Sequence, residues 1–155
     1  MTLRTGHIGL NVTDLDRSLA FYRDVLGYGV LGEGKEEGDD GGKRRYAFLG
    51  SPSGDGRPAL TLWQQARDGH DTGLAGLHHL ALEVDSLDRV REYETALRAY
   101  GVTFAHDGVV AHREGAASGG IFFHDPDGTR LEIFAASGAE EAPAPNASAP
   151  TCGFF

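Results

Sequence analysis

Two short segments of alternating apolar residues lie 72 positions apart, at residues 7–12 (HIGLNV) and 79–84 (HLALEV). In both, every second residue from position 8 or 80 is Ile, Leu or Val, and those between are small or polar. This period of two is the signature of a β-strand with one buried face. His7 and His79 head the two segments, and their parity places them opposite the apolar row. The small residue two positions later leaves space beside each imidazole, as beside a cavity.

The similarity between the two regions continues beyond these strands. At the same offset, Leu15-Asp16-Arg17 corresponds to residues 87–89, and Tyr28-Gly29-Val30 corresponds to residues 100–102. An internal repeat of this kind shows that the chain contains two copies of one supersecondary unit. Two copies are too few for a solenoid, and they suit a closed pseudo-symmetric domain or a pair of half-domains.

The first copy has the pattern β-α-β-β-β. Asp14 is a plausible N-cap, and apolar residues at helical spacing predict a helix from Leu15 to Leu26 that stops at Gly27. Its predicted strands are 6–12, 28–32, 44–49 and 58–64. Residues 33–42 are acidic and rich in glycine, which predicts a mobile hairpin tip.

The second copy follows the same order. Ser86 begins a predicted helix that stops near Gly101, and the turn Asp125-Pro126-Asp127-Gly128 precedes the last strand. Its predicted strands are 77–84, 102–104, 121–123 and 129–135. The fold class is therefore α+β, with two tandem βαβββ modules at about 6–65 and 77–136 in one domain, 1–136. The Ala- and Pro-rich residues 137–155 predict a flexible tail, with Phe154-Phe155 as an apolar anchor.

Composition excludes several classes of partner. A net charge of −9 and a pI near 5.1 argue against nucleic acids and anionic membranes, which both require a basic surface. No apolar run approaches the ~18 residues of a membrane span, and the first residues contain no signal-peptide core. The single cysteine, Cys152, forms no internal disulfide, which fits the cytoplasm.

The candidate chemistry centres on three residues. Glu132 lies within Leu131-Glu132-Ile133, so its carboxylate must be solvated, paired or bound to a cation. If the copies pack about a pseudo-two-fold axis, His7 and His79 approach that axis and Glu132 reaches the same cavity. Two imidazoles and one carboxylate suit Fe(II), Mn(II), Ni(II) or Zn(II). The alternative is that each histidine is a surface or core residue and that Glu132 is merely exposed.

The remaining histidines and the aromatic residues have weaker signals. His78 has the opposite parity to His79 and is expected on the other face of its strand. Four histidines have no repeat partner and are expected at the surface: His70, His106, His112 and His124, of which the last three are secondary candidates for the pocket. Four aromatic residues on strands line an aromatic pocket or belong to the core: Tyr46, Trp63, Phe122 and Phe134.

Two motifs resemble those of a known superfamily. The first combines His7-x-x-Leu10-x-Val12 with residues 14–27, and the second is Phe123-x-Asp125-Pro126-Asp127-Gly128-Thr129-x-Leu131-Glu132. In this order they resemble the opening and closing motifs of the vicinal oxygen chelate superfamily, which includes glyoxalase I, extradiol dioxygenases, fosfomycin-resistance transferases and bleomycin-binding proteins. The resemblance covers about residues 6–136. It implies paired modules that form a cupped, barrel-like mixed sheet with eight strands around a metal and helices outside.

The resemblance also implies the ligands of the metal. His7, His79 and Glu132 match the family's ligand positions, whereas the position that holds a second glutamate in glyoxalase I falls on Leu60 or Thr61. This departure disfavours a glyoxalase I with two glutamates. The remaining set of two histidines and one glutamate is similar to that of the dioxygenases and fosfomycin transferases, which favours Fe(II) or Mn(II) over Zn(II) or Ni(II).

The sequence thus predicts a divalent-metal-dependent enzyme whose small substrate is chelated through vicinal oxygens. Extradiol-dioxygenase-like chemistry on an aromatic compound is the first expectation, with Thr61 and the four aromatic residues in the substrate pocket. The alternative is a resistance protein that sequesters an aromatic or glycopeptide antibiotic without turnover. We also expect a homodimer, because sheet edges invite pairing, with modules paired within one chain or swapped between chains.

Overall fold

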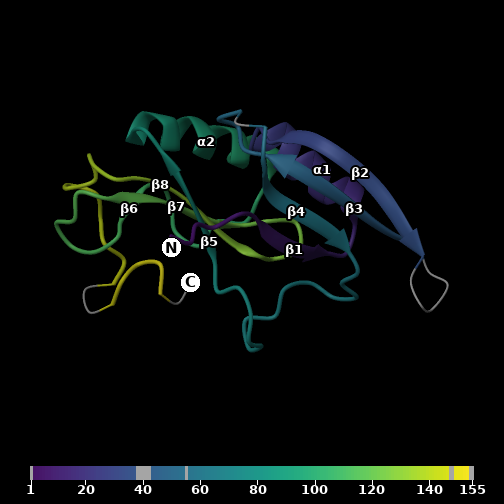
Figure 1. Cartoon of the computed structure of the whole chain (residues 1–155). Coiled ribbons are helices and arrows are strands. Elements are labelled where there is room, and N and C mark those ends of the chain that lie inside the picture. The colour runs from purple at the N-terminus through teal and green to yellow at the C-terminus, as the bar shows by residue number, and fades with distance from the viewer. Residues whose placement is uncertain (1, 38–42, 55, 147–148, 154–155) are drawn as a thin grey trace. The chain divides into compact units, whose positions relative to one another are not determined.

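Each half of the chain forms a four-stranded mixed sheet with one helical segment, which confirms the α+β class and the two tandem βαβββ modules. The computed structural model describes residues 2–37, 43–54, 56–146 and 149–153. It divides into two units, Met1–His70 and Asp71–Phe155. The boundary between them falls between the two predicted modules, which end at about residue 65 and begin at about residue 77, and Figure 1 labels the elements of both units.

The first unit has the sheet order β1-β4-β3-β2, in which β1 runs parallel to β4 and the other pairs are antiparallel. Its elements are β1 (Ile8–Val12), α1 (Leu15–Leu19), the π-helical segment η1 (Ala20–Val25), β2 (Gly29–Glu37), β3 (Lys43–Gly50) and β4 (Pro58–Gln64). The single predicted helix is therefore an α-helix that continues as a π-helix. Residues 33–37 of the predicted hairpin tip belong to β2, and residues 38–42 lie outside the described residues.

Local chemistry fixes both ends of this helical segment. The side chain of Asp14 accepts a hydrogen bond from the backbone N–H of Arg17 at 3.0 Å, which satisfies a donor that has no partner within the helix. Gly27 then ends the segment with a φ of 79°, a conformation that residues with a Cβ rarely adopt. The predicted start and stop are both confirmed.

The second unit has the sheet order β5-β8-β7-β6. Its elements are β5 (Leu80–Val84), α2 (Leu87–Tyr100), β6 (Val110–Ala111), β7 (Gly119–His124) and β8 (Arg130–Ala135). The strand predicted at 102–104 is wrong, because only an isolated bridge joins Phe104 to Phe123. The second strand of the module is β6, which has two residues and so contains no alternation that a sequence could display.

The sheet of the second unit has two chemically different faces. Residues directly opposite in neighbouring strands share a face, and Leu80 with Leu131 and Leu82 with Ile133 form apolar pairs of this kind. This face packs against α2, which contacts β5, β7 and β8 and lies along one side of the sheet in Figure 1. The opposite face presents Glu132 and its strand neighbours, so α2 leaves that face open to other contacts.

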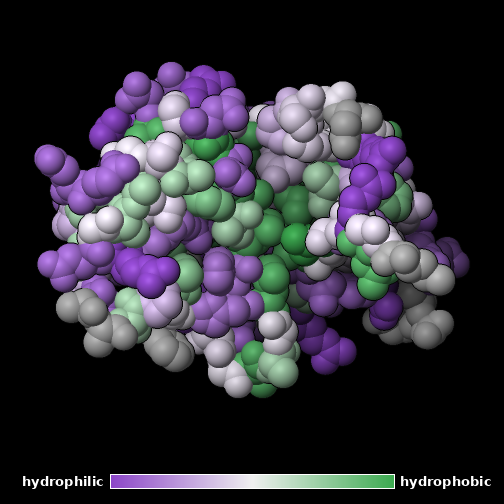
Figure 2. Space-filling model, turned by 60° about the vertical axis from the view of Figure 1, so that its left-hand side comes forward, coloured by the Kyte–Doolittle hydropathy of each residue, from purple (hydrophilic) through white to green (hydrophobic). Residues whose placement is uncertain are grey.

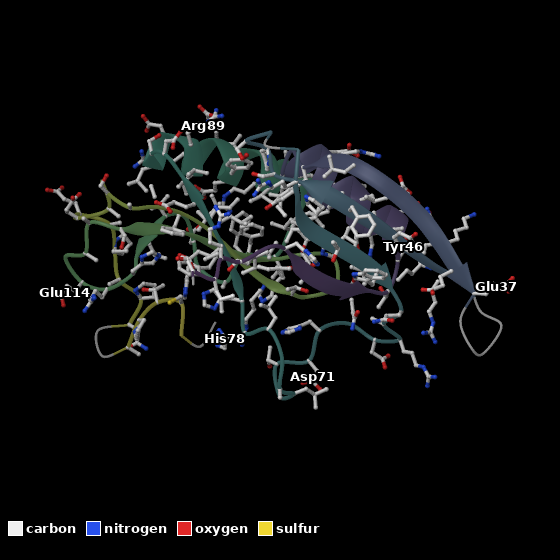
Figure 3. The ribbon with its side chains drawn as sticks, in the orientation of Figure 1. Glu37, Tyr46, Asp71, His78, Arg89 and Glu114 are labelled. Atoms are coloured by element: carbon white, nitrogen blue, oxygen red, sulfur yellow. The ribbon has the colours of Figure 1, made fainter. Side chains whose placement is uncertain are left out.

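The surface carries both hydrophilic and hydrophobic areas. On the face in Figure 2, hydrophilic residues lie mainly toward the edges, and hydrophobic residues are exposed through the middle. On α2, Arg91 pairs with Asp88 at 2.9 Å, and Arg89 points away from the sheet in Figure 3. Among the described residues, no helix has both the length and the apolar character that crossing a membrane requires.

Gly120 offers a test of the packing between β7 and β8. A Cβ at this position would lie 2.2 Å from the carbonyl oxygen of Ile133 and 2.7 Å from the Cα of Phe134, and neither backbone atom can move freely. We expect Gly120→Ala to lower the free energy of unfolding by about 3 kcal/mol, as overpacking does. Urea denaturation provides the measurement.

Gly29 is the matched control for this substitution. It also lies in a strand, its φ is not positive, and a Cβ there would meet nothing within 4 Å. Gly29→Ala should leave stability unchanged or raise it slightly. Equal stability of the two variants would contradict the close approach of β7 and β8.

Candidate functional site

Glu132 lies in the middle of β8, and its carboxylate is buried on the sheet face that α2 does not cover, with the residue only 2% exposed. Two histidines approach it. His112 Nε2 lies 2.5 Å from Oε1, and His79 Nε2 lies 3.8 Å from Oε2. The two carboxylate oxygens therefore have different neighbours, one within hydrogen-bond distance and one beyond it.

Hydrogen bonds engage both ring nitrogens of His112. A carboxylate oxygen accepts, so His112 Nε2–H donates to Glu132 Oε1. His112 Nδ1 lies 2.7 Å from the hydroxyl oxygen of Ser118. Ser118, His112 and Glu132 thus form a chain of hydrogen bonds that holds Oε1 in place.

His79 immediately precedes β5 and has the properties of a neutral imidazole. Burial lowers its pKa below the usual value, while the charge of Glu132 acts in the opposite direction, and His78 and Arg130 lower the pKa further. His79 Nδ1 contacts His78 Nδ1 at 2.8 Å. The expectation that His78 lies on the opposite face is wrong because β5 begins only at Leu80, so strand alternation does not govern residue 78.

Aromatic rings surround this group of polar residues. Phe122 lies opposite Glu132 in the β7–β8 pairing, and Phe134 is two residues further along β8. Their ring centroids lie 6.2 Å and 5.4 Å from that of His112. The structure therefore brings two of the predicted pocket residues together with Glu132. His106 also contacts Phe122, with centroids 5.6 Å apart.

The other three predicted pocket residues form a separate cluster in the first unit. The Tyr46 ring stacks on Trp63 at a centroid distance of 5.2 Å, and Trp63 Nε1–H donates to Thr61 Oγ1 at 2.9 Å. Phe48 packs edge-on against Trp63. Figure 3 shows Tyr46 on β3, the strand next to β4.

The strand register identifies the counterpart of Glu132 in the first unit. Gly9 pairs with Thr61 between β1 and β4, and Ala81 pairs with Glu132 between β5 and β8. Gly9 and Ala81 are equivalent in the repeat, so Thr61, rather than Leu60, occupies the position of Glu132. Thr61 is 1% exposed and carries a neutral hydroxyl, so this position offers no second carboxylate.

The second unit supplies two donors that fit a divalent cation. The 3.8 Å between His79 Nε2 and Glu132 Oε2 is too long for a hydrogen bond, and it is close to the separation of about 3.0–3.4 Å between two ligands on one ion. Among the described residues, no three His, Cys, Asp or Glu side chains are grouped so that they could hold a metal ion. His7 is exposed just before β1 in the first unit, and its role as a ligand stays a prediction.

Sequence reasoning missed two parts of this site. It expected His112 at the surface and kept it only as a secondary pocket candidate, and it assigned Cys152 no role. Burial raises the pKa of the Cys152 thiol, and the Glu132 charge raises it further, so the thiol lies within electrostatic reach of the carboxylate. No repeat partner marks either residue. The third secondary candidate, His124, instead has Nδ1 3.4 Å from the Thr103 carbonyl oxygen.

Comparisons with known proteins agree with this architecture. A model of the Glyoxalase/Bleomycin resistance protein/Dioxygenase superfamily matches residues 4–133. A lactoylglutathione lyase from Haemophilus influenzae is 34% identical, over 82% of this chain and 88% of its own length. A glyoxylase/bleomycin resistance protein/dioxygenase domain from Frankia sp. superposes with a TM-score of 0.70 at 25% identity, over 87% and 98% of the two chains.

A second solved structure shows the same fold. The fosfomycin resistance protein FosX from Listeria monocytogenes, solved with Mn(II), superposes with a TM-score of 0.61 at 21% identity. The superposition covers 90% of this chain and 98% of that protein. At this identity the likeness concerns the fold alone.

The reactivity of Cys152 should report the charge on Glu132. Because the pKa of the thiol is raised, less thiolate exists at a given pH, and alkylation by iodoacetamide should require a higher pH than for a free cysteine. Glu132→Gln removes the negative charge, so the pH profile of the alkylation rate should shift downward. Mass spectrometry over about pH 7 to 10 measures this rate.

Glu83→Gln is the control for this measurement, since Glu83 is an exposed carboxylate on β5. Its profile should match that of the wild type. A shift of the same size in both variants would mean that the thiol responds to overall charge rather than to Glu132.

Proposed function

Because the chain belongs to the Glyoxalase/Bleomycin resistance protein/Dioxygenase superfamily, we propose that it is a divalent-metal-dependent enzyme that binds a small substrate through two neighbouring oxygen atoms. The observation that carries the proposal is the buried carboxylate of Glu132. His112 holds its Oε1, and Oε2 faces a neutral imidazole of His79. A carboxylate and an imidazole with this arrangement are ready-made ligands for a cation.

His79, Glu132 and His7 would hold the metal. A bound divalent cation acts as a Lewis acid that polarises substrate oxygens. Mn(II) and Fe(II) suit a set of two imidazoles and one carboxylate. His112 keeps Oε1 engaged, which leaves Oε2 directed toward His79, while Phe122 and Phe134 limit the access of water to Glu132.

The relatives change the reaction type that we favour. The sequence analysis favoured extradiol-dioxygenase-like chemistry, whereas a curated relative at 34% identity is a lactoylglutathione lyase. We therefore propose lyase-type chemistry without dioxygen. Thr61 stands where a second glutamate would lie, so the proton-transfer groups of the described site are concentrated around Glu132 and His112 in the second unit.

A second function is supported by the aromatic cluster of the first unit. The stacked pair of Tyr46 and Trp63, with Phe48 edge-on, offers ring faces that suit a flat aromatic ligand. A protein that sequesters such a ligand without turnover needs no metal. Measurements of metal binding and of turnover therefore distinguish an enzyme from a sequestering protein.

Two further expectations stay predictions. The sheets have outer strands β1, β2 and β5, whose edges favour pairing with a second copy of the chain, whereas the outer edge of β6 bonds to the C-terminal residues. Sedimentation at micromolar concentration tests the predicted homodimer. The cytoplasmic location inferred from the single cysteine also stays a prediction.

Glu132→Gln should abolish most metal binding while the fold survives. The substitution keeps the shape of the side chain and removes its charge, so we expect Mn(II) affinity to fall by at least ~10-fold. Added Mn(II) should raise the melting temperature of the wild type only, because a ligand that binds only the folded state stabilises it by mass action. The metal-free variant should be at least as stable as metal-free wild type, since it buries no charge.

The control is again Glu83→Gln, which should retain the Mn(II) response of the wild type. If Mn(II) raises the melting temperature of Glu132→Gln and wild type equally, Glu132 is not a ligand. Binding of an aromatic ligand without any response to Mn(II) or Fe(II) would instead favour sequestration.

Turnover should depend on metal and not on dioxygen. We expect the metal-loaded protein to form or cleave lactoylglutathione or a related thioester, which ultraviolet absorbance follows. The rate should be equal in air and under nitrogen, and it should be lost in His79→Ala. Consumption of dioxygen with a catechol would reverse the choice between lyase and dioxygenase.

A further inference from the structure

The C-terminal segment, residues 137–146 and 149–153, lies outside the part of the chain that matches the family model, residues 4–133. Its composition predicted a flexible tail. In the structure it makes ordered contacts with the sheet of the second unit. Figure 1 shows the yellow segment passing β6 after it leaves β8. The Phe154-Phe155 anchor lies outside the described residues.

The first contact of the C-terminal segment is at β7 and the hairpin before it. The backbone N–H of Ala139 donates to the carbonyl of Ala117 at 2.8 Å, and Ala139 is fully buried. A Cβ on Gly119 would lie 2.7 Å from the Cβ of Ala139, which is too close for two carbon atoms. Ala139 can pack at this position only because residue 119 is a glycine. The start of the segment is therefore packed into the sheet rather than resting on it.

The second contact is along the outer edge of β6. The backbone N–H of Ala111 donates to the carbonyl of Pro143 at 2.9 Å. Thr151 then bonds to two successive carbonyls: its hydroxyl donates to Ala111 at 2.6 Å and its backbone N–H donates to His112 at 2.9 Å. Thr151 is 4% exposed, so water does not compete for these hydrogen bonds.

These bonds hold the main chain of His112 on the outer edge of β6, the edge that does not pair with β7. On the inner side, His112 N–H donates to the carbonyl of Ser118 at 3.1 Å. On the outer side, Thr151 binds the carbonyl of the same residue. The imidazole of His112 in turn holds Oε1 of Glu132, so a shift of this main chain moves the hydrogen bond on the carboxylate.

We propose that the C-terminal segment contributes to the site and that Thr151 is a positioning residue. Through its two hydrogen bonds to the edge of β6, Thr151 holds His112 in the position from which it hydrogen-bonds to Glu132. This inference rests on the proposed function where it concerns metal affinity. The positioning itself is independent of any metal. Thr151 acts through His112 and does not touch substrate.

Cys152 supports the same placement of the C-terminal segment. It follows Thr151 directly, and its thiol is half-buried within electrostatic reach of Glu132. Cys152 therefore lies directly beyond the two hydrogen bonds that Thr151 makes to the edge of β6. Since Cys152 is the only cysteine of the chain, its alkylation reports whether this end of the segment is docked.

The test uses three full-length variants. Thr151→Val keeps the shape of the side chain and removes the hydroxyl, whereas Thr151→Ser keeps the hydroxyl and should rescue every effect. Thr95→Val is the matched control, because the Thr95 hydroxyl donates to the Arg91 carbonyl at 2.9 Å on α2, remote from Glu132 in the fold. All three are compared with the wild type by circular dichroism to establish that they fold.

Two measurements on metal-free protein report whether Thr151 positions His112. The first is the downfield NMR signal of the proton on His112 Nε2, assigned by its loss in His112→Asn. The second is the alkylation rate of Cys152. In Thr151→Val we expect the signal to shift and exchange faster, and alkylation to accelerate by about fivefold, the factor that loss of one hydrogen bond gives.

A third measurement is Mn(II) affinity, which should fall by about tenfold in Thr151→Val, as for other residues that orient metal ligands. Thr151→Ser and Thr95→Val should resemble the wild type in all three measurements. An unchanged His112 signal in Thr151→Val overturns the proposal, whether or not alkylation accelerates. If wild type binds no Mn(II), the proposed metal function fails, and the NMR signal still decides the role of Thr151.

Discussion

The burial of one carboxylate is the constraint on which the second unit depends. A charged group that is 2% exposed is costly unless it is paired and hydrogen-bonded. Glu132 meets this requirement through His112 on Oε1 and through the nearby His79 on the other side. The second ring nitrogen of His112 in turn hydrogen-bonds to the Ser118 hydroxyl. The buried carboxylate of Glu132 therefore fixes the residues around it, and α2 leaves their face free by packing on the opposite one.

The two units pair their first and last strands in the same register, but they bury different residues at the equivalent position of the last strand. Thr61 and Glu132 occupy equivalent positions opposite Gly9 and Ala81. The hydroxyl of Thr61 accepts a hydrogen bond from Trp63, so this position of the first unit carries a neutral group beside stacked aromatic rings. One module thus provides the charged chemistry and the other provides aromatic surface, although both derive from the same strand pattern.

Local sequence signals predicted most helices and strands, whereas features that depend on how strands pair could not be predicted. The alternation around His7 and His79, the caps at Asp14 and Ser86, and the glycine stops predicted the first strands and helices, because each signal lies within a few residues. The choice between Leu60 and Thr61 required the register of β1 on β4, which a sequence does not display. His112 was missed for the same reason, since its contact with Glu132 depends on β6, a strand of two residues.

The C-terminal segment makes hydrogen bonds that its composition does not indicate. Alanine and proline supply little apolar area, so a segment rich in them is expected to stay loose. Its order comes from the sheet instead, because an edge strand leaves N–H and C=O groups unpaired and a buried edge must satisfy them. A strand as short as β6 makes few bonds to β7, so partners on its outer side contribute much of what holds it. The shortness of β6 is thus the reason that a segment beyond the family match can influence Glu132.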